Sequence, residues 1–195
     1  MPAPSNAALT RRRLGGAVLL LAGIAVAAVV LWPGGNDGPA APNKKLPVRF
    51  VSVPPLGMVF AHPTSWKRTV SNRVIGLRAP DGSVLVFFSS PVAKPAVARV
   101  KAEAERQLRK QFAPAKIVRD GPGRLGARTV QSFELRGRDK SGPVRALVLV
   151  DSTKYRTYSV TVLTGARPSR RRLGEARAII STVRFGKPQA LPSKP

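Results

Sequence analysis

The sequence contains no cysteine, and this absence excludes several kinds of chemistry at once. No disulfide can form, and there is no thiol nucleophile or cysteine-rich zinc site. A lipoprotein is excluded as well, because no cysteine is present to carry the lipid. An exported domain of this chain must therefore be stable through the packing of its core alone.

Residues suited to acid–base or metal chemistry are also few. His62 is the single histidine, and a catalytic base or metal ligand needs partners within reach, so we interpret it as a packing residue. No Gly-rich phosphate loop or nucleophile elbow is present. The sequence predicts no enzyme, no cofactor and no metal site. Most acidic residues after position 46 are expected in turns or on exposed helix faces, with no pair at acid–base spacing: Asp81, Glu103, Glu105, Asp120, Glu134, Asp139, Asp151 and Glu175.

Acidic residues are outnumbered overall, with 9 against 34 basic residues and a net charge of +25. Such a balance favours anionic partners: nucleic acid, anionic lipid or an anionic wall polymer. The alternative is a compositional preference for arginine codons, which the abundance of Ala, Gly, Pro and Val also fits.

One long apolar run, residues 14–32, contains no charged residue and no proline. About 20 apolar residues in a helix cross a hydrocarbon core of about 30 Å. The run therefore predicts a transmembrane anchor. Arg11, Arg12 and Arg13 precede it, and basic residues stay on the cytoplasmic side. The alternative is a cleaved signal peptide, whose apolar region is normally shorter, about 7–15 residues.

The anchor divides the chain into a cytoplasmic N-terminus (1–13), the anchor (14–32), a Pro/Gly linker (33–46), one extracytoplasmic domain (47–186) and a Pro-rich tail (187–195). Alternating apolar residues and turn signals predict strands, and two stripes at helical spacing predict helices. A meander of strands with two such helices is an α+β pattern: a central antiparallel sheet with a helix on either side, an α/β/α sandwich. The expected strands are 48–53, 58–61, 66–70, 74–77, 83–89, 116–119, 128–136, 144–150 and 155–163, and the expected helices are 95–112 and 168–183.

The segment 57–66, GMVFAHPTSW, resembles the opening hairpin of the PsbP-like domains, with a glycine, an alternating strand and an aromatic-Pro-x-x-Trp turn. The ending Ser-Thr-Val-Arg-Phe at 181–185 is similar to the end of that family's last helix. The family includes a photosystem extrinsic protein, a Ran-binding nuclear import factor and anchored bacterial proteins. The resemblance covers about 47–186 and implies a binding or accessory role. Its signature residues are Gly57, Phe60, Pro63 and Trp66, for which we expect structural roles; His62 stands where the family usually has tyrosine.

A group of arginines at the start of the last expected helix is the candidate anion-binding site: Arg167, Arg170, Arg171 and Arg172. Cations there oppose the helix dipole, whereas the helix N-terminus and guanidinium groups both attract anions. On a helical projection, the head groups of Arg170, Arg171 and Arg172 are expected to reach solvent. The alternative is that they are solvated side chains of an arginine-rich chain.

The leading hypothesis from the sequence is a membrane-anchored, extracytoplasmic binding or accessory domain that engages an envelope protein or an anionic lipid or wall polymer. The main alternative is a basic module that faces the cytoplasm and binds nucleic acid, which requires the opposite topology. A third possibility is a hydrolase acting on envelope polymers.

Overall fold

The computed structural model describes residues 47–71, 74–91, 93–165 and 167–189. The predicted N-terminus, anchor and linker lie outside these residues, as does most of the Pro-rich tail. Within them, neither helix has the length and apolar character needed to cross a bilayer.

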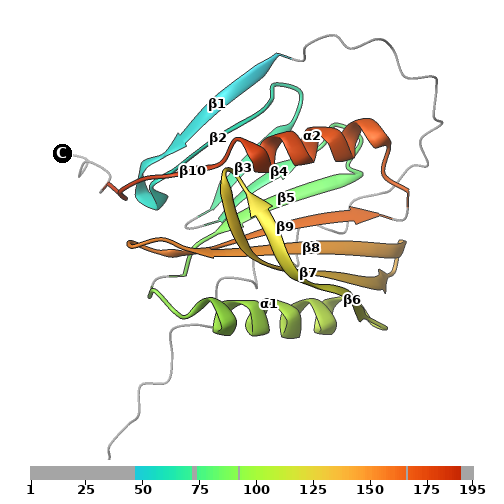
Figure 1. Cartoon of the computed structure of the whole chain (residues 1–195). Helices are drawn as coiled ribbons and strands as arrows, with labels where there is room; N and C mark the ends of the chain where they lie inside the picture. The colour runs from blue at the N-terminus through green and yellow to red at the C-terminus, as the bar shows by residue number, and fades with distance from the viewer. Residues whose placement is uncertain (1–46, 72–73, 92, 166, 190–195) are drawn as a thin grey trace, which may run out of the picture.

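The described chain contains two α-helices and ten strands (Figure 1). In chain order they are β1 (Val48–Val53), the short helical turn η3 (Pro54–Leu56), β2 (Met58–Pro63), β3 (Lys67–Ser71), β4 (Val74–Arg78), β5 (Val84–Ser89), α1 (Val97–Gln111), β6 (Lys116–Leu125), β7 (Arg128–Asp139), β8 (Gly142–Ser152), β9 (Thr157–Gly165), α2 (Arg170–Ser181) and β10 (Arg184–Phe185).

Seven strands form the main antiparallel sheet, in the order β3-β4-β5-β9-β8-β7-β6. Successive residues of a strand point to opposite faces. In β8, Leu149 therefore packs in the core that contains α2, whereas Val148 packs in the core that contains α1. Figure 1 shows the two helices on opposite faces of this sheet. The predicted α+β class, with antiparallel sheet and two helices, is confirmed.

A second, three-stranded sheet has the order β1-β2-β10 and was not separated from the first in the sequence prediction. Its inner side chains Val51, Met58 and Phe60 join Ile179 of α2 in one core. The last strand, β10, has two residues and pairs with β2 through Arg184 to Val59 and Phe185 to Met58. The C-terminal end of the domain thus closes onto its N-terminal hairpin.

The largest error of the sequence prediction concerns β6. We expected a short strand, 116–119, followed by a break at Gly121-Pro122-Gly123, but the strand runs unbroken through Pro122, with a register shift between Ile117 and Arg119. The reason is its position: β6 is the outer strand of the sheet. A proline that lacks an N–H is tolerated on such an edge.

The helix predictions were right within two residues at each end, because the apolar stripes were clear. The strand 83–89 was expected to be buried on both faces, but β5 alternates between buried and half-buried residues. The strand buried on both faces is β9, in which every residue is buried. It lies in the middle of the main sheet, between β5 and β8.

A first prediction concerns Gly57, which joins η3 to β2. Its φ of +61° is left-handed, and an added Cβ would lie 2.5 Å from the carbonyl oxygen of Gly186. Gly57→Ala should therefore destabilise the domain by more than the roughly 1–2 kcal/mol that a left-handed residue costs. The measurement is urea unfolding of the full chain in detergent.

Gly174→Ala is the matched control. Gly174 lies within α2, and nothing would contact its added Cβ. An alanine there should stabilise the domain by about 0.5–1 kcal/mol through helix propensity. Equal effects of the two substitutions would show that the close approach of 186–188 to Gly57 does not exist in solution.

Candidate functional site

The predicted arginine cluster lies where α2 begins. Ser169 is the N-cap of this helix, and its hydroxyl oxygen accepts a hydrogen bond from the backbone N–H of Arg172 at 3.3 Å. This is the usual way in which a serine satisfies an orphan donor of the first turn. Arg170, Arg171 and Arg172 are therefore the first three helical residues, and Arg167 precedes the cap.

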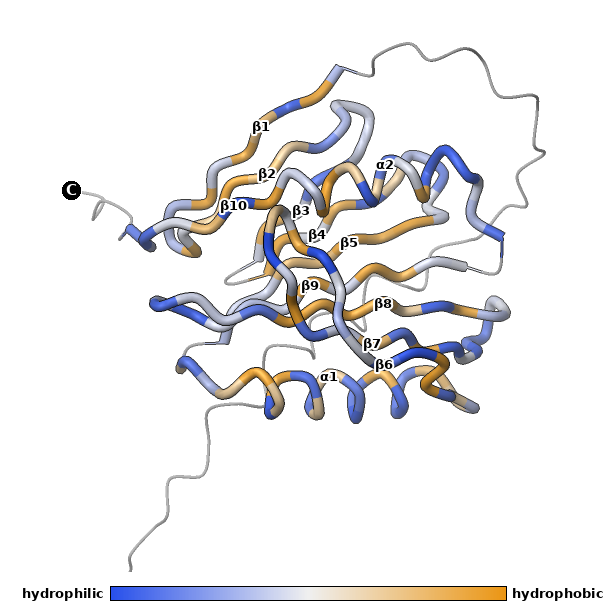
Figure 2. Tube along the Cα trace, viewed as in Figure 1, coloured by the Kyte–Doolittle hydropathy of each residue, from blue (hydrophilic) through white to orange (hydrophobic). Residues whose placement is uncertain are grey.

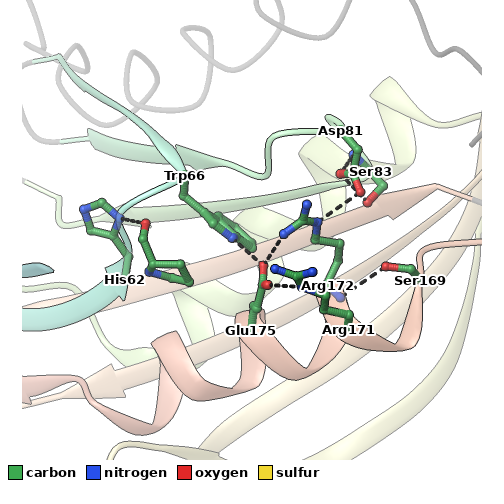
Figure 3. A network of polar contacts seen from close by, with 9 residues as sticks. His62, Trp66, Asp81, Ser83, Ser169, Arg171, Arg172 and Glu175 are labelled. Atoms are coloured by element: carbon green, nitrogen blue, oxygen red, sulfur yellow. Dashed lines mark hydrogen bonds and ion pairs between the residues drawn. The ribbon is translucent and has the colours of Figure 1, made fainter. Parts of the chain in front are cut away.

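A buried carboxylate, that of Glu175, organises the side chains around this helix start (Figure 3). The residue is 6% exposed. One of its oxygens accepts hydrogen bonds from the indole N–H of Trp66 and from Nη1 of Arg172, both at 2.7 Å. The other accepts from Nε of Arg171 at 3.0 Å. A buried charge of this kind is tolerated only when it is paired and hydrogen-bonded.

Arg172 extends the network to the turn between β4 and β5. Its Nε donates to Oδ2 of Asp81 at 3.0 Å. The other oxygen of Asp81 accepts from the N–H of Ser83 at 3.0 Å and from its hydroxyl at 2.8 Å. One guanidinium thus joins two carboxylates from distant parts of the chain. The network ties α2 both to this turn and to Trp66, which lies between β2 and β3.

This arrangement corrects two expectations. The side chain of Arg172 is only 15% exposed and is committed to Glu175 and Asp81, so its head group does not project into solvent as the helical projection predicted. Glu175 itself was assigned to the acidic residues of turns and exposed helix faces, but it is buried, as is Asp151. The projection failed because it contained no information on what packs beside the helix.

The network also determines the protonation of its carboxyl groups. Burial alone would raise the pKa of Glu175, but hydrogen bonds from Trp66 and the two arginines outweigh burial and hold this pKa below its ordinary value. In the same way, hydrogen bonds from Ser83 and Arg172 outweigh burial and lower the pKa of Asp81. Both groups are therefore carboxylates at neutral pH and do not serve as proton donors.

Three members of the predicted cluster remain at the surface. Arg167 and Arg170 are exposed, and neither forms an ion pair with a carboxylate in the described part of the chain. The side chain of Arg171 is 62% exposed although its Nε is bound to Glu175. The exposed cationic group at the start of α2 thus consists of Arg167, Arg170 and the outer part of Arg171.

The four signature residues lie in packing positions. Phe60 is fully buried and stacks on Phe88 with ring centroids 4.6 Å apart. Pro63 is buried at the end of β2, and its carbonyl oxygen accepts the N–H of Trp66 at 3.0 Å, which closes the turn. Trp66 is 3% exposed. Gly57, with its close approach to Gly186, likewise lies at a packed position.

His62 is a packed residue that is 4% exposed. Its Nδ1 lies 2.8 Å from the carbonyl oxygen of Pro63, so Nδ1 carries the proton, and its Nε2 is buried without a partner. Burial lowers the pKa of this histidine, and the positive charges of Arg68 and Arg49 lower it further against the effect of the hydrogen bond. A neutral ring in this position fits the packing role expected for it.

A groove of about 600 Å³ lies between the first turns of α1 and strands β6, β7 and β8. The ion pair of Lys101 with Asp120 lines it, as does Asp151, which pairs with Arg128. The sequence did not indicate this groove, because its residues come from four elements with no shared motif. Among the described residues, no group of three histidine and acidic side chains is placed to hold a metal ion.

No family model matches the sequence, and no curated protein matches it. Among solved structures, cyanobacterial PsbP (CyanoP) from Synechocystis sp. PCC 6803 is similar with a TM-score of 0.52 and 13% identity, over 76% of this chain and 98% of that one. The fold is PsbP-like. This likeness confirms the predicted resemblance at the level of architecture, since identity this low carries fold but not function.

Two further structures are similar. A protein from Bacteroides thetaiotaomicron VPI-5482 has a TM-score of 0.52 and 11% identity, over 71% of this chain but only 48% of that one, so the chain spans about half of its length. LpqN of Mycobacterium tuberculosis, which is involved in cell envelope biogenesis, has a TM-score of 0.47 and 12% identity, over 72% of this chain and 91% of that one.

A second prediction concerns Glu175. Glu175→Gln leaves Arg172 without its buried counter-charge and should destabilise the full chain by about 2–3 kcal/mol in urea unfolding at pH 7. The pKa of Glu175 is lowered from 4.5 by folding, so its contribution is complete above that pH and is lost as the pH falls through the folded-state pKa. The gap between wild type and variant should therefore narrow below about pH 5.

Glu105→Gln is the control, because this carboxylate is 34% exposed and pairs with Arg109 at i,i+4 on the surface of α1. Its loss should change the free energy of unfolding by less than about 0.5 kcal/mol. If the two glutamines have the same effect, or if the Glu175 gap does not depend on pH, the buried network does not stabilise the domain.

Proposed function

We propose that this chain is a membrane-anchored, non-catalytic binding or accessory domain of the cell envelope. Residues 14–32 anchor it, the PsbP-like domain faces away from the cytoplasm, and its partner is an envelope protein or an anionic envelope component. The exposed arginines at the start of α2 are the contact for such an anion.

The observation that carries this proposal is how the acidic residues are used. Seven of the eight acidic residues after position 46 form ion pairs within the described chain. In a chain with 34 basic and 9 acidic residues, these pairs leave a large surplus of cations at the surface. Carboxylates held in ion pairs are poorly placed for proton transfer, whereas exposed guanidinium groups are suited to binding anions.

The first test concerns the side of the membrane on which the C-terminal domain lies. A reporter enzyme that is active only outside the cytoplasm, fused after Pro195, should be active, because Arg11, Arg12 and Arg13 hold the N-terminus inside. Replacing these three arginines with serine should reduce the activity. A reporter that works only in the cytoplasm is the control, and activity from that reporter alone would refute the proposal and favour the nucleic-acid-binding alternative.

The arginines are tested separately. Arg167→Gln together with Arg170→Gln should weaken binding of the detergent-solubilised chain to polyphosphate, a soluble polyanion, about tenfold or more, since each cation near an anionic surface contributes about 1 kcal/mol. The effect should shrink as salt screens exposed charges. Neither residue belongs to the Glu175 network, so unfolding should be unchanged.

The matched control is Arg99→Gln together with Lys110→Gln, two exposed cations on α1. If this pair weakens binding equally, diffuse positive charge is responsible and the start of α2 is not a site.

A further inference from the structure

The outer face of the small sheet exposes apolar side chains to solvent. Phe50 of β1 is 74% exposed, Val48 is 55% exposed and Val59 of β2 is 40% exposed. Pairing of Phe50 with Ala61 and of Ser52 with Val59 places these side chains on one face, opposite the buried face of Val51. We call Val48, Phe50 and Val59 the outer apolar patch.

The patch is not explained by the packing of the domain. Six large apolar side chains are exposed in the described ranges, and three of them lie here. They lie on and beside β1, an edge strand of its sheet. Figure 2 shows hydrophobic and hydrophilic segments alternating along β1 at the periphery of the molecule. Exposed apolar residues that gather rather than scatter mark an interaction surface.

The charged residues in the segments that form the small sheet are all positive. No acidic residue occurs from 47 to 63 or from 184 to 189. Arg184 pairs with Val59 across the small sheet and so lies on the face of the patch, where its guanidinium donates to the carbonyl oxygen of Val183. Arg49 is also exposed on β1, but it pairs with His62 and so lies on the opposite face of the strand from Phe50. Aromatic and aliphatic side chains among cations are the composition that binds an anionic lipid surface.

The position of the patch in the chain also indicates that it binds a lipid surface. β1 begins directly after the linker 33–46, which follows the expected anchor. Fourteen Pro/Gly-rich residues span about 20 Å on average if they behave as a flexible coil. The strand that carries Phe50 and Val48 is therefore the part of the domain tethered closest to the bilayer, where the effective lipid concentration is high.

We infer that the outer apolar patch docks the domain onto the anionic surface of the bilayer that holds its own anchor. This inference rests on the anchor of the proposed function. Phe50 and Val48 enter the head-group region, while Arg184 contacts a lipid phosphate. The exposed arginines of α2 are then a separate contact, available to a partner.

The absence of cysteine allows a direct test. Ser52→Cys places one label site on the face of the patch without removing an apolar residue, and Val118→Cys, at a residue of β6 that is 41% exposed, is the control site. Each full chain carries an environment-sensitive fluorophore and is reconstituted as one copy per nanodisc. The discs contain either phosphatidylcholine alone or phosphatidylcholine with phosphatidylglycerol, with brominated acyl chains as quencher.

We expect quenching at position 52 to be at least about threefold stronger than at position 118 in discs with phosphatidylglycerol, and to weaken in neutral discs and at high salt. Phe50→Ser in the Ser52→Cys chain should remove most of this quenching. Tyr155→Ser, which changes another exposed aromatic residue, should leave it intact. Phe50 is mostly in solvent, so its replacement should not unfold the domain.

Other outcomes overturn the inference. Equal quenching at both positions, or no dependence on phosphatidylglycerol, would show that the patch does not bind an anionic bilayer. Nanodiscs that hold two copies of the chain are a further comparison. If the fluorescence at position 52 changes only in these discs, the patch binds a second copy of the chain. If the chain does not stay in the disc, the anchor of the proposed function fails, and the same labelled chain added to phosphatidylglycerol vesicles still tests the patch.

Discussion

The buried carboxylate of Glu175 is the interaction on which the position of α2 depends. It lies beneath the helix at 6% exposure and accepts hydrogen bonds from Trp66, Arg171 and Arg172. A charge in this position is costly unless all of these partners are present. The network therefore selects one placement of α2, because that placement brings Trp66, after β2, to the carboxylate of Glu175 and brings Asp81, in the turn before β5, to Arg172 (Figure 3).

The opposite end of α2 is fixed by backbone contacts rather than by charge. After the helix, the chain pairs with β2 and then approaches Gly57, whose carbonyl oxygen accepts the N–H of Gly186 at 2.7 Å. Beneath this closure Tyr158 stacks on Phe185 and donates its hydroxyl to the carbonyl oxygen of Leu56 at 2.6 Å. The beginning and the end of the domain thus stabilise each other, although more than 120 residues separate them in sequence.

Much of the architecture could be predicted because it is encoded locally. The stripes of α1 and α2 and the alternation in the hairpins gave the α+β class and most element positions. The division into two sheets could not be predicted, since two-residue β10 has no periodicity to detect. The break expected at Pro122 was wrong because the effect of a proline depends on whether its strand is at an edge, which only the strand order shows.

The candidate site, too, could be predicted only as far as it is encoded by residues close together in the sequence. The spacing of Arg171 and Arg172 to Glu175, at i+4 and i+3, is visible in the sequence and is a signal for pairing that the sequence prediction did not use. The indole of Trp66 and the carboxylate of Asp81 come from elsewhere in the chain, and they decide that Arg172 is an internal residue. Arg167 and Arg170 have no such partners in the described chain, so they keep the surface position that the sequence predicts for a basic residue.

The charge at the surface depends on which arginines are paired with carboxylates and which are not. Asp81 and Glu175 pair with Arg171 and Arg172, and neither pairs with Arg167 or Arg170 in the described chain. The small sheet has no acidic residue between 47 and 63, and Arg184 pairs with Val59 on its apolar face. With 34 basic and 9 acidic residues, the surplus of basic residues makes the surface cationic even though most acidic residues of the domain are paired. The packing of α2 and the exposure of Arg167 and Arg170 are thus two consequences of where a few carboxylates lie.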